Sequence, residues 1–388
     1  MLAVLALCAV QFVDVLGGTV VITALPTMLA DLGASQSASS LVVTGYAMFF
    51  GGLLVLGARC GDRYGHRRVL LAGAVLFGLA SPVAALSGDV SFVVAARCVQ
   101  GAAAALSVPA ALRLLTALPV DRRRSLAWWS ASGAAAGASG LLLGGLVTQW
   151  ASWRAIFWFT LVLAGLLVVA VRRAVPVDPG DHSPLDVLGA VLLTGAVMAW
   201  VVGAALLEFP RWRLAGLGLV AVGVLLVPVL VGLERRHRAP LLPGSAVRNR
   251  NLRAGAVGSF LNTATTTSAV TLVTLHLQGI DRVSAAAAGL LLLPFSLGVV
   301  AGAAVSGPFV RRPLVALAGG LALVAIGVLA LVPLDGAAVA VPFCLALSGA
   351  GLGLSSVAAN AIGTDVPSDL AGVAAGVLNT AAQVGTAI

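Results

Sequence analysis

Residues 58–68 read Ala-Arg-Cys-Gly-Asp-Arg-Tyr-Gly-His-Arg-Arg and lie between the apolar runs 40–58 and 69–87. Each run has about the 20 residues that a helix needs to cross a bilayer. Short loops on the cytoplasmic side of a membrane are rich in Lys and Arg. The stretch therefore predicts two antiparallel membrane helices that are joined at the inner face.

The composition of the whole chain extends this prediction to a polytopic membrane protein. Of its 388 residues, 60% are hydrophobic and only 10% are charged, against about 25% charged in an average soluble domain. The mean hydropathy is +1.07. A soluble enzyme or a disordered chain does not fit this composition.

The net charge is +9, and every Lys or Arg position in the chain is an arginine. These arginines lie in short clusters between apolar runs. That distribution indicates membrane topology and not a basic face that follows phosphates, so we expect no nucleic-acid partner. The four cysteines stand singly, without the spacing of a metal site, so no metal is expected.

Thirteen apolar runs predict about thirteen spans. They are 4–26, 40–58, 69–87, 91–116, 125–148, 155–171, 185–207, 214–233, 254–277, 285–307, 313–333, 337–358 and 371–388. With the N-terminus inside, 17 arginines fall in cytoplasmic loops and 4 in outer loops. This bias is a strong positive-inside signal and predicts a multi-pass protein of the cytoplasmic (inner) membrane.

The charged turn resembles a motif of the major facilitator superfamily, Gly-x-x-x-Asp-Arg-x-Gly-x-Arg-Arg, with Ala58 at the first position. In that family the loop acts as a latch between the two halves of the transporter. The resemblance implies this role for Gly61, Asp62, Arg63, Gly65, Arg67 and Arg68.

Two further motifs resemble those of drug/proton antiporters. The stretch from Arg97 through Gln100 and Gly101 matches Arg-x-x-Gln-Gly of their fourth helix. An arginine inside a membrane helix is costly, so it normally faces a partner or a watery cavity. Asp14, followed by Thr-Val-Val and Ala-Leu-Pro, resembles the first-helix motif of the fourteen-helix antiporters. The family's aspartate falls on Gly17, and Asp14 is the only acid in the middle of a predicted span.

The fifth run carries a series of glycines whose spacings of four, three and four place them on one helix face, which allows close helix packing. The members of this face are Gly133, Gly137, Gly140 and Gly144, followed by Gly145. Residues 140–145 also resemble the antiporter signature Gly-Pro-x-x-Gly-Gly, with Leu141 in place of proline. Close packing of small residues alone would explain the face equally well.

The resemblance implies an all-α major facilitator fold with two six-helix bundles and two inserted helices. Its expected parts are 1–173, 174–240 and 241–388, and the last bundle is expected to be incomplete because the sequence stops within the thirteenth helix.

The function that the resemblance implies is export of hydrophobic or cationic drugs, antibiotics or secondary metabolites by alternating access. The exporter would use the proton gradient and no cofactor, and would act as a monomer in the lipid bilayer. Asp14 would carry the proton, with Arg97 helping to keep it ionised. The expected lining of the pathway is completed by Tyr46, Gln100 and Asn262.

Three alternatives stay open. A nutrient uniporter or symporter would share the fold. A polytopic membrane enzyme would need a cluster of acids, histidines or metal ligands at one membrane face, and the sequence shows only isolated ones. A non-transporting, degenerate relative would explain Gly17, Leu141 and the short C-terminal end.

Overall fold

The computed structural model describes residues 1–35, 38–179, 187–207, 210–234, 244–306, 312–331, 340–367 and 370–387, and the regular elements among them are all helices. The first half consists of α1 (Leu2–Thr19), the 3₁₀ turn η1 (Ile22–Ala24), α2 (Leu25–Asp31), α3 (Ala38–Tyr64), α4 (His66–Ala85), α5 (Val90–Ala117), α6 (Arg122–Trp150) and α7 (Trp153–Ala174).

An inserted pair and a second half follow. The inserted pair is α8 (Val187–Leu206) and α9 (Arg213–Glu234), joined through η2 (Pro210–Trp212). The second half consists of α10 (Gly244–Arg248), α11 (Arg250–Gly279), α12 (Ala285–Val305), α13 (Pro313–Leu329), α14 (Val341–Gly363) and α15 (Ala371–Ala387).

Each predicted span has a helical counterpart, and nine helical segments of the described chain are long and apolar enough to cross a membrane. The long helix α11 is not among them, since its many Thr, Ser and Asn residues lower its hydropathy. Several span ends, at 185–186, 307, 332–333, 337–339 and 388, lie outside the described residues.

Two predicted elements differ in detail. The first predicted span, 4–26, lies within a membrane-length segment from Leu2 to Asp31. That segment is not one regular helix, because α1 ends at Thr19 and the chain resumes through η1 into α2, with Pro26 in its first turn. Proline is tolerated there because the N–H groups of a first turn have no partner within the helix. The expected loop 59–68 is instead a corner, in which Gly65 alone separates α3 from α4, since helical hydrogen bonding continues into the polar residues.

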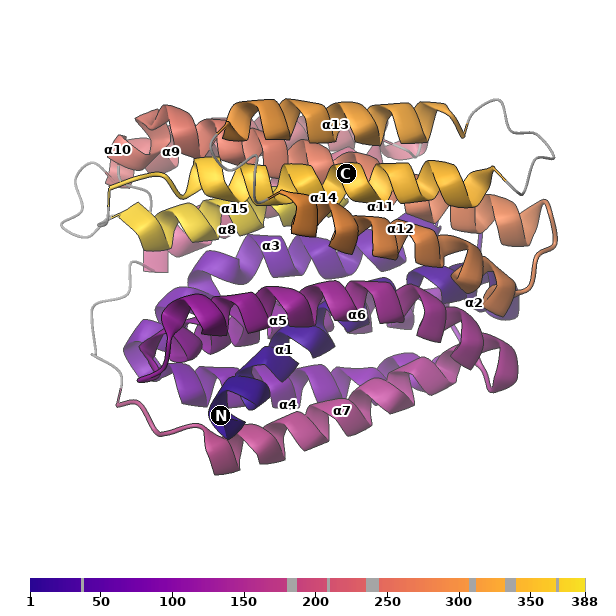
Figure 1. Cartoon of the computed structure of the whole chain (residues 1–388), viewed down its shortest axis with the longest axis horizontal. Coiled ribbons are helices and arrows are strands. Elements are labelled where there is room, and N and C mark those ends of the chain that lie inside the picture. The colour runs from indigo at the N-terminus through magenta and orange to yellow at the C-terminus, as the bar shows by residue number, and fades with distance from the viewer. Residues whose placement is uncertain are drawn as a thin grey trace.

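The helices lie side by side along the long axis of the molecule (Figure 1). The first half, in indigo to magenta, and the second half, in orange to yellow, meet where α6 packs on α12 and α3 packs on α15. The helix α8 of the inserted pair also packs against α3.

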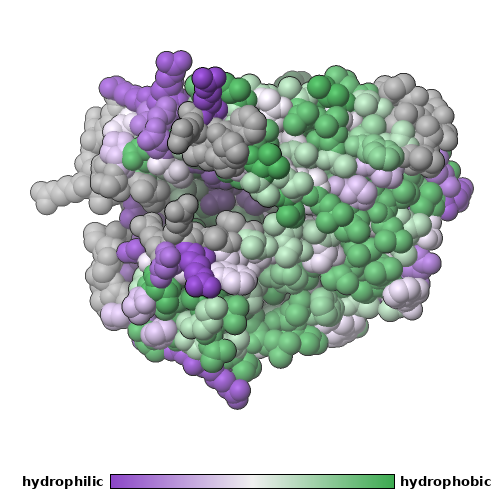
Figure 2. All heavy atoms as spheres, viewed as in Figure 1, coloured by the Kyte–Doolittle hydropathy of each residue, from purple (hydrophilic) through white to green (hydrophobic). Residues whose placement is uncertain are grey.

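The outer surface matches a bilayer. Figure 2 shows hydrophobic residues over most of the visible flank, with most of the hydrophilic ones toward the left end and fewer at the right edge. The helix α7 illustrates the pattern, because it buries Ile156 and Phe157 in the first half and exposes Val162 and Leu166. An exposed apolar face of this extent suits contact with lipid chains.

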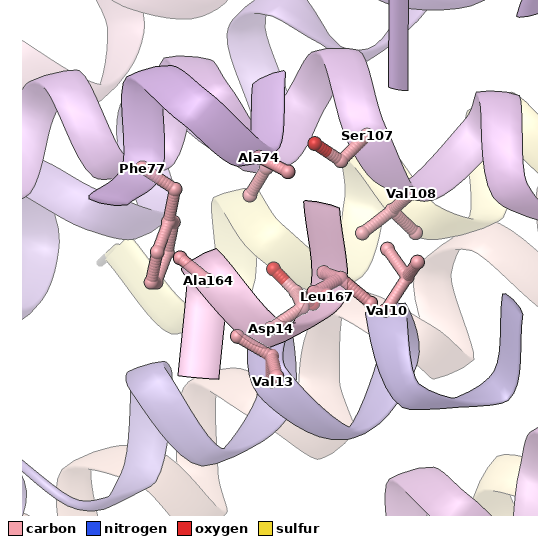
Figure 3. A pocket seen from close by; sticks show the side chains of 10 residues that line it. Val10, Val13, Asp14, Ala74, Phe77, Ser107, Val108, Ala164 and Leu167 are labelled. Carbon is pink, nitrogen blue, oxygen red and sulfur yellow. The ribbon is translucent and has the colours of Figure 1, made fainter. Parts of the chain in front are cut away.

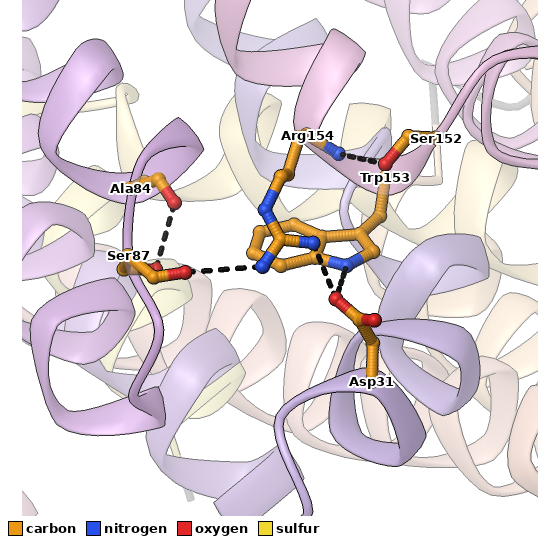
Figure 4. Close-up of polar contacts among 6 residues, drawn as sticks. All are labelled: Asp31, Ala84, Ser87, Ser152, Trp153 and Arg154. Carbon is orange, nitrogen blue, oxygen red and sulfur yellow. Dashed lines mark hydrogen bonds and ion pairs between the residues drawn. The ribbon is translucent and has the colours of Figure 1, made fainter.

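At the other end of the first half, a polar cluster joins three elements (Figure 4). Asp31 at the end of α2 pairs with Arg154 and accepts a hydrogen bond of 3.0 Å from the Trp153 indole. The Arg154 guanidinium also donates to the Ser87 carbonyl between α4 and α5, at 3.1 Å. The cluster therefore fixes the ends of α2, α4 and α7 to one another.

Candidate functional site

The centre of the first half holds a buried acid. Asp14 on α1 is only 8% exposed, and the hydroxyl of Tyr46 on α3 donates a hydrogen bond to its carboxylate. The same hydroxyl lies 3.3 Å from the Asp14 carbonyl oxygen. The structure thus brings together two residues that are 32 positions apart in the sequence.

Arg97 on α5 reaches this acid through the tyrosine. Its guanidinium carbon lies 4.2 Å from the centroid of the Tyr46 ring, a distance typical of a cation–π contact. Among the ion pairs of the described residues, none joins Arg97 to Asp14 directly. The Tyr46 side chain therefore contacts both charged groups, with its hydroxyl on the acid and its ring on the arginine.

Backbone and amide oxygens complete the environment of Arg97, whose side chain is 2% exposed. One terminal nitrogen donates to the Gly17 carbonyl and to the Gln100 amide oxygen, each at 3.0 Å. A buried charge normally needs such partners, because desolvation without them is expensive. The arginine therefore binds α1 to α5 as well as balancing charge.

Gln100 passes the network on to two more helices. Its amide nitrogen donates to the Ser81 hydroxyl on α4 at 3.0 Å, and Thr160 on α7 lies 3.3 Å from the same oxygen. Tyr46 and Gln100 are both buried within the first half. The next residue, Gly101, allows this closeness, since a Cβ there would stand 2.2 Å from the Tyr46 carbonyl oxygen.

A small cavity lies beside the acid, between α1, α4, α5 and α7. Figure 3 shows Asp14 and Ser107 among the side chains that line it, with Phe77 on one side. Its volume is about 20 Å³, and one buried water needs about 10–15 Å³ and two to four polar partners. The carboxylate and the hydroxyl supply two such partners in an otherwise apolar space.

Gly17, which occupies the position of the family's aspartate, faces Phe77 on α4. A Cβ at Gly17 would lie 2.9 Å from the Phe77 ring, and Phe77 also lines the cavity beside Asp14. Positions 14 and 17 thus both border the region around Phe77, and the ring occupies the space that a side chain at 17 would need.

Asn262 of α11 lies in the second half and is fully buried. Its amide oxygen accepts a hydrogen bond of 2.7 Å from Ser355 on α14, and its amide nitrogen has no partner in the described part of the chain. The structure therefore does not bring Asn262 into the network around Asp14.

The glycine face of α6 packs on α1 and the residue that follows it. Cβ atoms at Gly140 and Gly144 would stand 2.0 Å from the Thr19 hydroxyl and 2.1 Å from the Val20 carbonyl oxygen. Gly133 and Gly137 face Gln11 and Val15, which lie about two turns and one turn before Thr19 on α1.

Gly145 points elsewhere and makes part of the contact between the halves. A Cβ there would lie 2.2 Å from the Ala285 carbonyl oxygen on α12. Nearby, the Gln149 side chain accepts from the Ala286 amide at 3.0 Å, and Gln278 donates to the Thr23 carbonyl at 2.8 Å. The halves are thus joined near the end at which α6 and α11 finish.

The charged corner between α3 and α4 is held from within the first half. Asp62 lies 3.4 Å from His66 and 3.9 Å from Arg59. The carboxylate of Asp178, beyond α7, accepts from the backbone N–H groups of His66 and Arg67 at the start of α4.

Two glycines lie in tight positions at this corner, and the backbone itself requires the second, Gly65. Gly65 has φ +92°, and a Cβ there would also lie 2.7 Å from the Asp178 carbonyl oxygen. A Cβ at Gly61 would stand 2.3 Å from the His66 ring. The other two cationic members differ in their surroundings, since Arg63 lies 5.5 Å from the Tyr64 ring centroid and Arg68 is exposed.

Sequence reasoning missed several partners, namely Ser81, Ser107, Thr160, Asp178 and Ser355. The first three and the last are hydroxyl residues inside predicted spans, and a search of every span for polar residues would have found them. Asp178 had no such signal, because it lies far along the chain from the corner that it binds.

The sequence matches the family model of the Major Facilitator Superfamily over residues 7–388. It is 34% identical to a puromycin resistance protein of Streptomyces alboniger, over 98% of this chain and 78% of that protein. It is 32% identical to a tetracenomycin C resistance and export protein of Streptomyces glaucescens, over 95% and 71% of the two chains. A cephamycin export protein of Amycolatopsis lactamdurans is also 32% identical, over 99% and 82%.

Among solved structures, a peptide transporter has the same fold, with a TM-score of 0.68 at 16% identity over 99% of this chain and 87% of the other. A human organic anion transporter superposes with a TM-score of 0.65 at 15% identity, over 100% and 91%.

Proposed function

Because this chain belongs to the Major Facilitator Superfamily, we propose that it exports hydrophobic drugs, antibiotics or secondary metabolites across the cytoplasmic membrane in exchange for protons. The names of the similar proteins support export, since they include resistance to puromycin and export of tetracenomycin C and cephamycin. The proposed exporter works as a monomer and needs no cofactor.

The observation that carries the proton coupling is the buried carboxylate of Asp14. An acid near the middle of a membrane helix costs about 2.5–3.5 kcal/mol on insertion scales, so packing alone gives no reason to keep it. Asp14 has one hydrogen-bond donor in Tyr46 and room for a water molecule beside it. A proton that reaches this water could therefore be transferred to the carboxylate.

Asp14 takes the part that the family's motif gives to the position of Gly17. The Phe77 ring fills the space at position 17 and lines the cavity at position 14. Phe77 therefore borders both Asp14 and position 17. This arrangement supports Asp14 as the functional acid, about one helical turn before the position that the family uses.

Arg97 balances the charge of Asp14 through the Tyr46 ring. When the acid is ionised, the cation attracts it from across the ring, and when a proton binds, that attraction is lost. The Gly17 carbonyl on α1 also accepts from Arg97, so a change in the charge of Asp14 alters the forces between α1, α3 and α5. This coupling is the proposed link between protonation of Asp14 and movement of the first half.

The proposed topology places the N-terminus and the arginine-rich end in the cytoplasm, by the positive-inside rule. Contacts such as Gln278 with Thr23 and Gly145 with Ala285 then lie near the outer face, so the structure corresponds to an outward-closed state. Alternating access would open these contacts by rocking 1–173 against 241–388, with 174–240 as the inserted pair. The corner with Asp62 would act as the latch on the cytoplasmic side.

The experiment is to measure drug-induced proton release from the purified protein in detergent, beside dye efflux in everted vesicles. Wild type should release protons on binding a hydrophobic cation such as ethidium, and Asp14→Asn should bind it without release. Asp89→Asn is the matched control, since Asp89 is an exposed acid that caps α5. Equal release from wild type and Asp14→Asn would refute the coupling role.

A further inference from the structure

A second, larger cavity lies between the inserted helix α8 and the second half. Its volume is about 510 Å³, within the range of about 300–1,000 Å³ that is usual for small-molecule sites. It is bounded by α3, α8, α10, α11 and α15. None of its lining residues belongs to the site around Asp14.

The lining is apolar along its length and basic at one end. Val55, Val197 and Ala256 form part of the wall. Trp200 and Phe260 also line the cavity, with stacked rings whose centroids are 6.2 Å apart. Arg253, in the first turn of α11, lines it as well. From Arg253 to Phe260 the helix rises by about 10 Å, at about 1.5 Å per residue.

We propose that this cavity binds one anionic phospholipid from the leaflet that meets the arginine-rich end, with an acyl chain between α8 and α11 and the phosphate at Arg253. This site goes beyond the proposed export, since its occupant is a resident lipid and not a transported drug.

Two observations favour a lipid with this charge. An apolar cavity of this size holds water poorly, and its walls lose dispersion contacts unless hydrocarbon fills it. Arg253 is exposed, and no ion pair among the described residues includes it. The nearby acid Asp365 is bound by the Asn251 amide at 3.0 Å. Basic pockets between membrane helices on the cytoplasmic side bind anionic lipid head groups in this way.

The site would also explain how the inserted pair is held. The helix α8 contacts α3 and α15 along one side, and the cavity separates part of it from α11. A bound acyl chain would fill that separation and hold α8 against the second half.

Trp200 provides the test, because a bromine atom on an acyl chain quenches the fluorescence of a nearby tryptophan. The protein is placed in vesicles that contain brominated phosphatidylglycerol or brominated phosphatidylcholine with the same chains, and the signal of a Trp200→Phe variant is subtracted. We expect phosphatidylglycerol to associate about fivefold more strongly, as one arginine near the lipid surface contributes about 1 kcal/mol.

Two pairs of variants separate a site from general attraction. Arg253→Gln should remove the preference for phosphatidylglycerol, whereas Arg250→Gln, which changes a non-lining arginine of the same helix, should keep it. Ala256→Phe should fill the cavity and remove the preference, whereas Leu261→Phe, on an exposed position, should not.

The proposal is overturned if both arginine variants lose the preference equally, or if Ala256→Phe leaves it unchanged. It is also overturned if saturating ethidium displaces the brominated lipid, because the cavity would then belong to the substrate. None of these measurements needs a proton gradient, so failure of export leaves the lipid test valid.

Discussion

The two halves each place a polar side chain twelve positions after the start of a helix, but the chemistry differs. Asp14 lies twelve positions after Leu2, the first residue of α1, and Asn262 lies twelve positions after Arg250, the first residue of α11. Asp14 is an acid that contacts Tyr46 and, through it, the cation Arg97. Asn262 is a neutral amide whose oxygen accepts from Ser355.

We infer from this difference that the two halves have different roles. Only the acid can change its charge at ordinary pH, so a proton can alter the first half at this depth and not the second. The amide nitrogen of Asn262 is buried without a partner in the described chain, and such a donor suits a polar atom of a substrate. We therefore expect coupling to be sensitive to the first half and substrate preference to the second.

The largest effect should come from exchanging the two groups. The double variant Asp14→Asn with Asn262→Asp keeps one acid and one amide, but places the acid beside the neutral Ser355, with no tyrosine and arginine pair. An unbalanced acid at this depth costs about 2.5–3.5 kcal/mol, and we expect proton-driven efflux to fall to background. Recovery of drug-induced proton release in the double variant would show that the surroundings of Asp14 are irrelevant.

Removing the buried cation should come next. Arg97→Gln removes the cation over the Tyr46 ring and the hydrogen bonds to Gly17 and Gln100, and it should lower stability by about 1–3 kcal/mol for each buried polar partner left unsatisfied. Arg97→Lys keeps the charge but cannot reproduce the contacts to Gly17, Gln100 and Tyr46 together, so it should recover part of the efflux. Thermal unfolding in detergent measures the first effect and vesicle efflux the second. A Gln variant as stable as wild type would contradict the balance of charge.

A smaller effect should come from removing one hydroxyl group in each half. Tyr46→Phe keeps the ring beneath Arg97 and removes the hydrogen bond to the acid, which is worth about 1.5–3 kcal/mol for a charged partner. Ser355→Ala removes the neutral bond to Asn262, worth about 0.5–1.5 kcal/mol. Efflux measured from pH 5 to 9 should change its pH profile in the first variant only. The same change in both variants would remove the distinction between the halves.

The smallest effect on stability is expected at the charged corner. Asp62→Asn breaks two partly exposed ion pairs, which contribute about 0–1 kcal/mol, and should slow efflux while leaving folding intact. Asp178→Ala removes the acceptor of two backbone N–H groups at the start of α4 and should cost more, about 0.5–2 kcal/mol. Unfolding midpoints of the two variants give the order, and the reverse order would contradict the cap.

The apolar runs were sufficient to predict the helices, because a bilayer requires long segments that satisfy their own backbone hydrogen bonds. The apolar runs could not predict the pairing of Asp14 with Tyr46, since that contact depends on how α1 and α3 pack. The glycine face of α6 could be predicted from the spacing of its glycines. The spacing did not predict that four of them contact the α1 segment whereas Gly145 contacts α12. Asp178 could not be predicted for the same reason, as a contact across more than 100 residues leaves no local pattern.

The Phe77 ring links the effect of a residue at position 17 to the residue at position 77. A carboxylate added at Gly17 would meet the ring, whose nearest atom lies 2.9 Å from a Cβ at that position, so the ring would have to turn or shift. A smaller residue at 77 would remove that contact and would also enlarge the water-sized space beside Asp14. The outcome of restoring the family's aspartate at position 17 therefore depends on the size of one residue on α4.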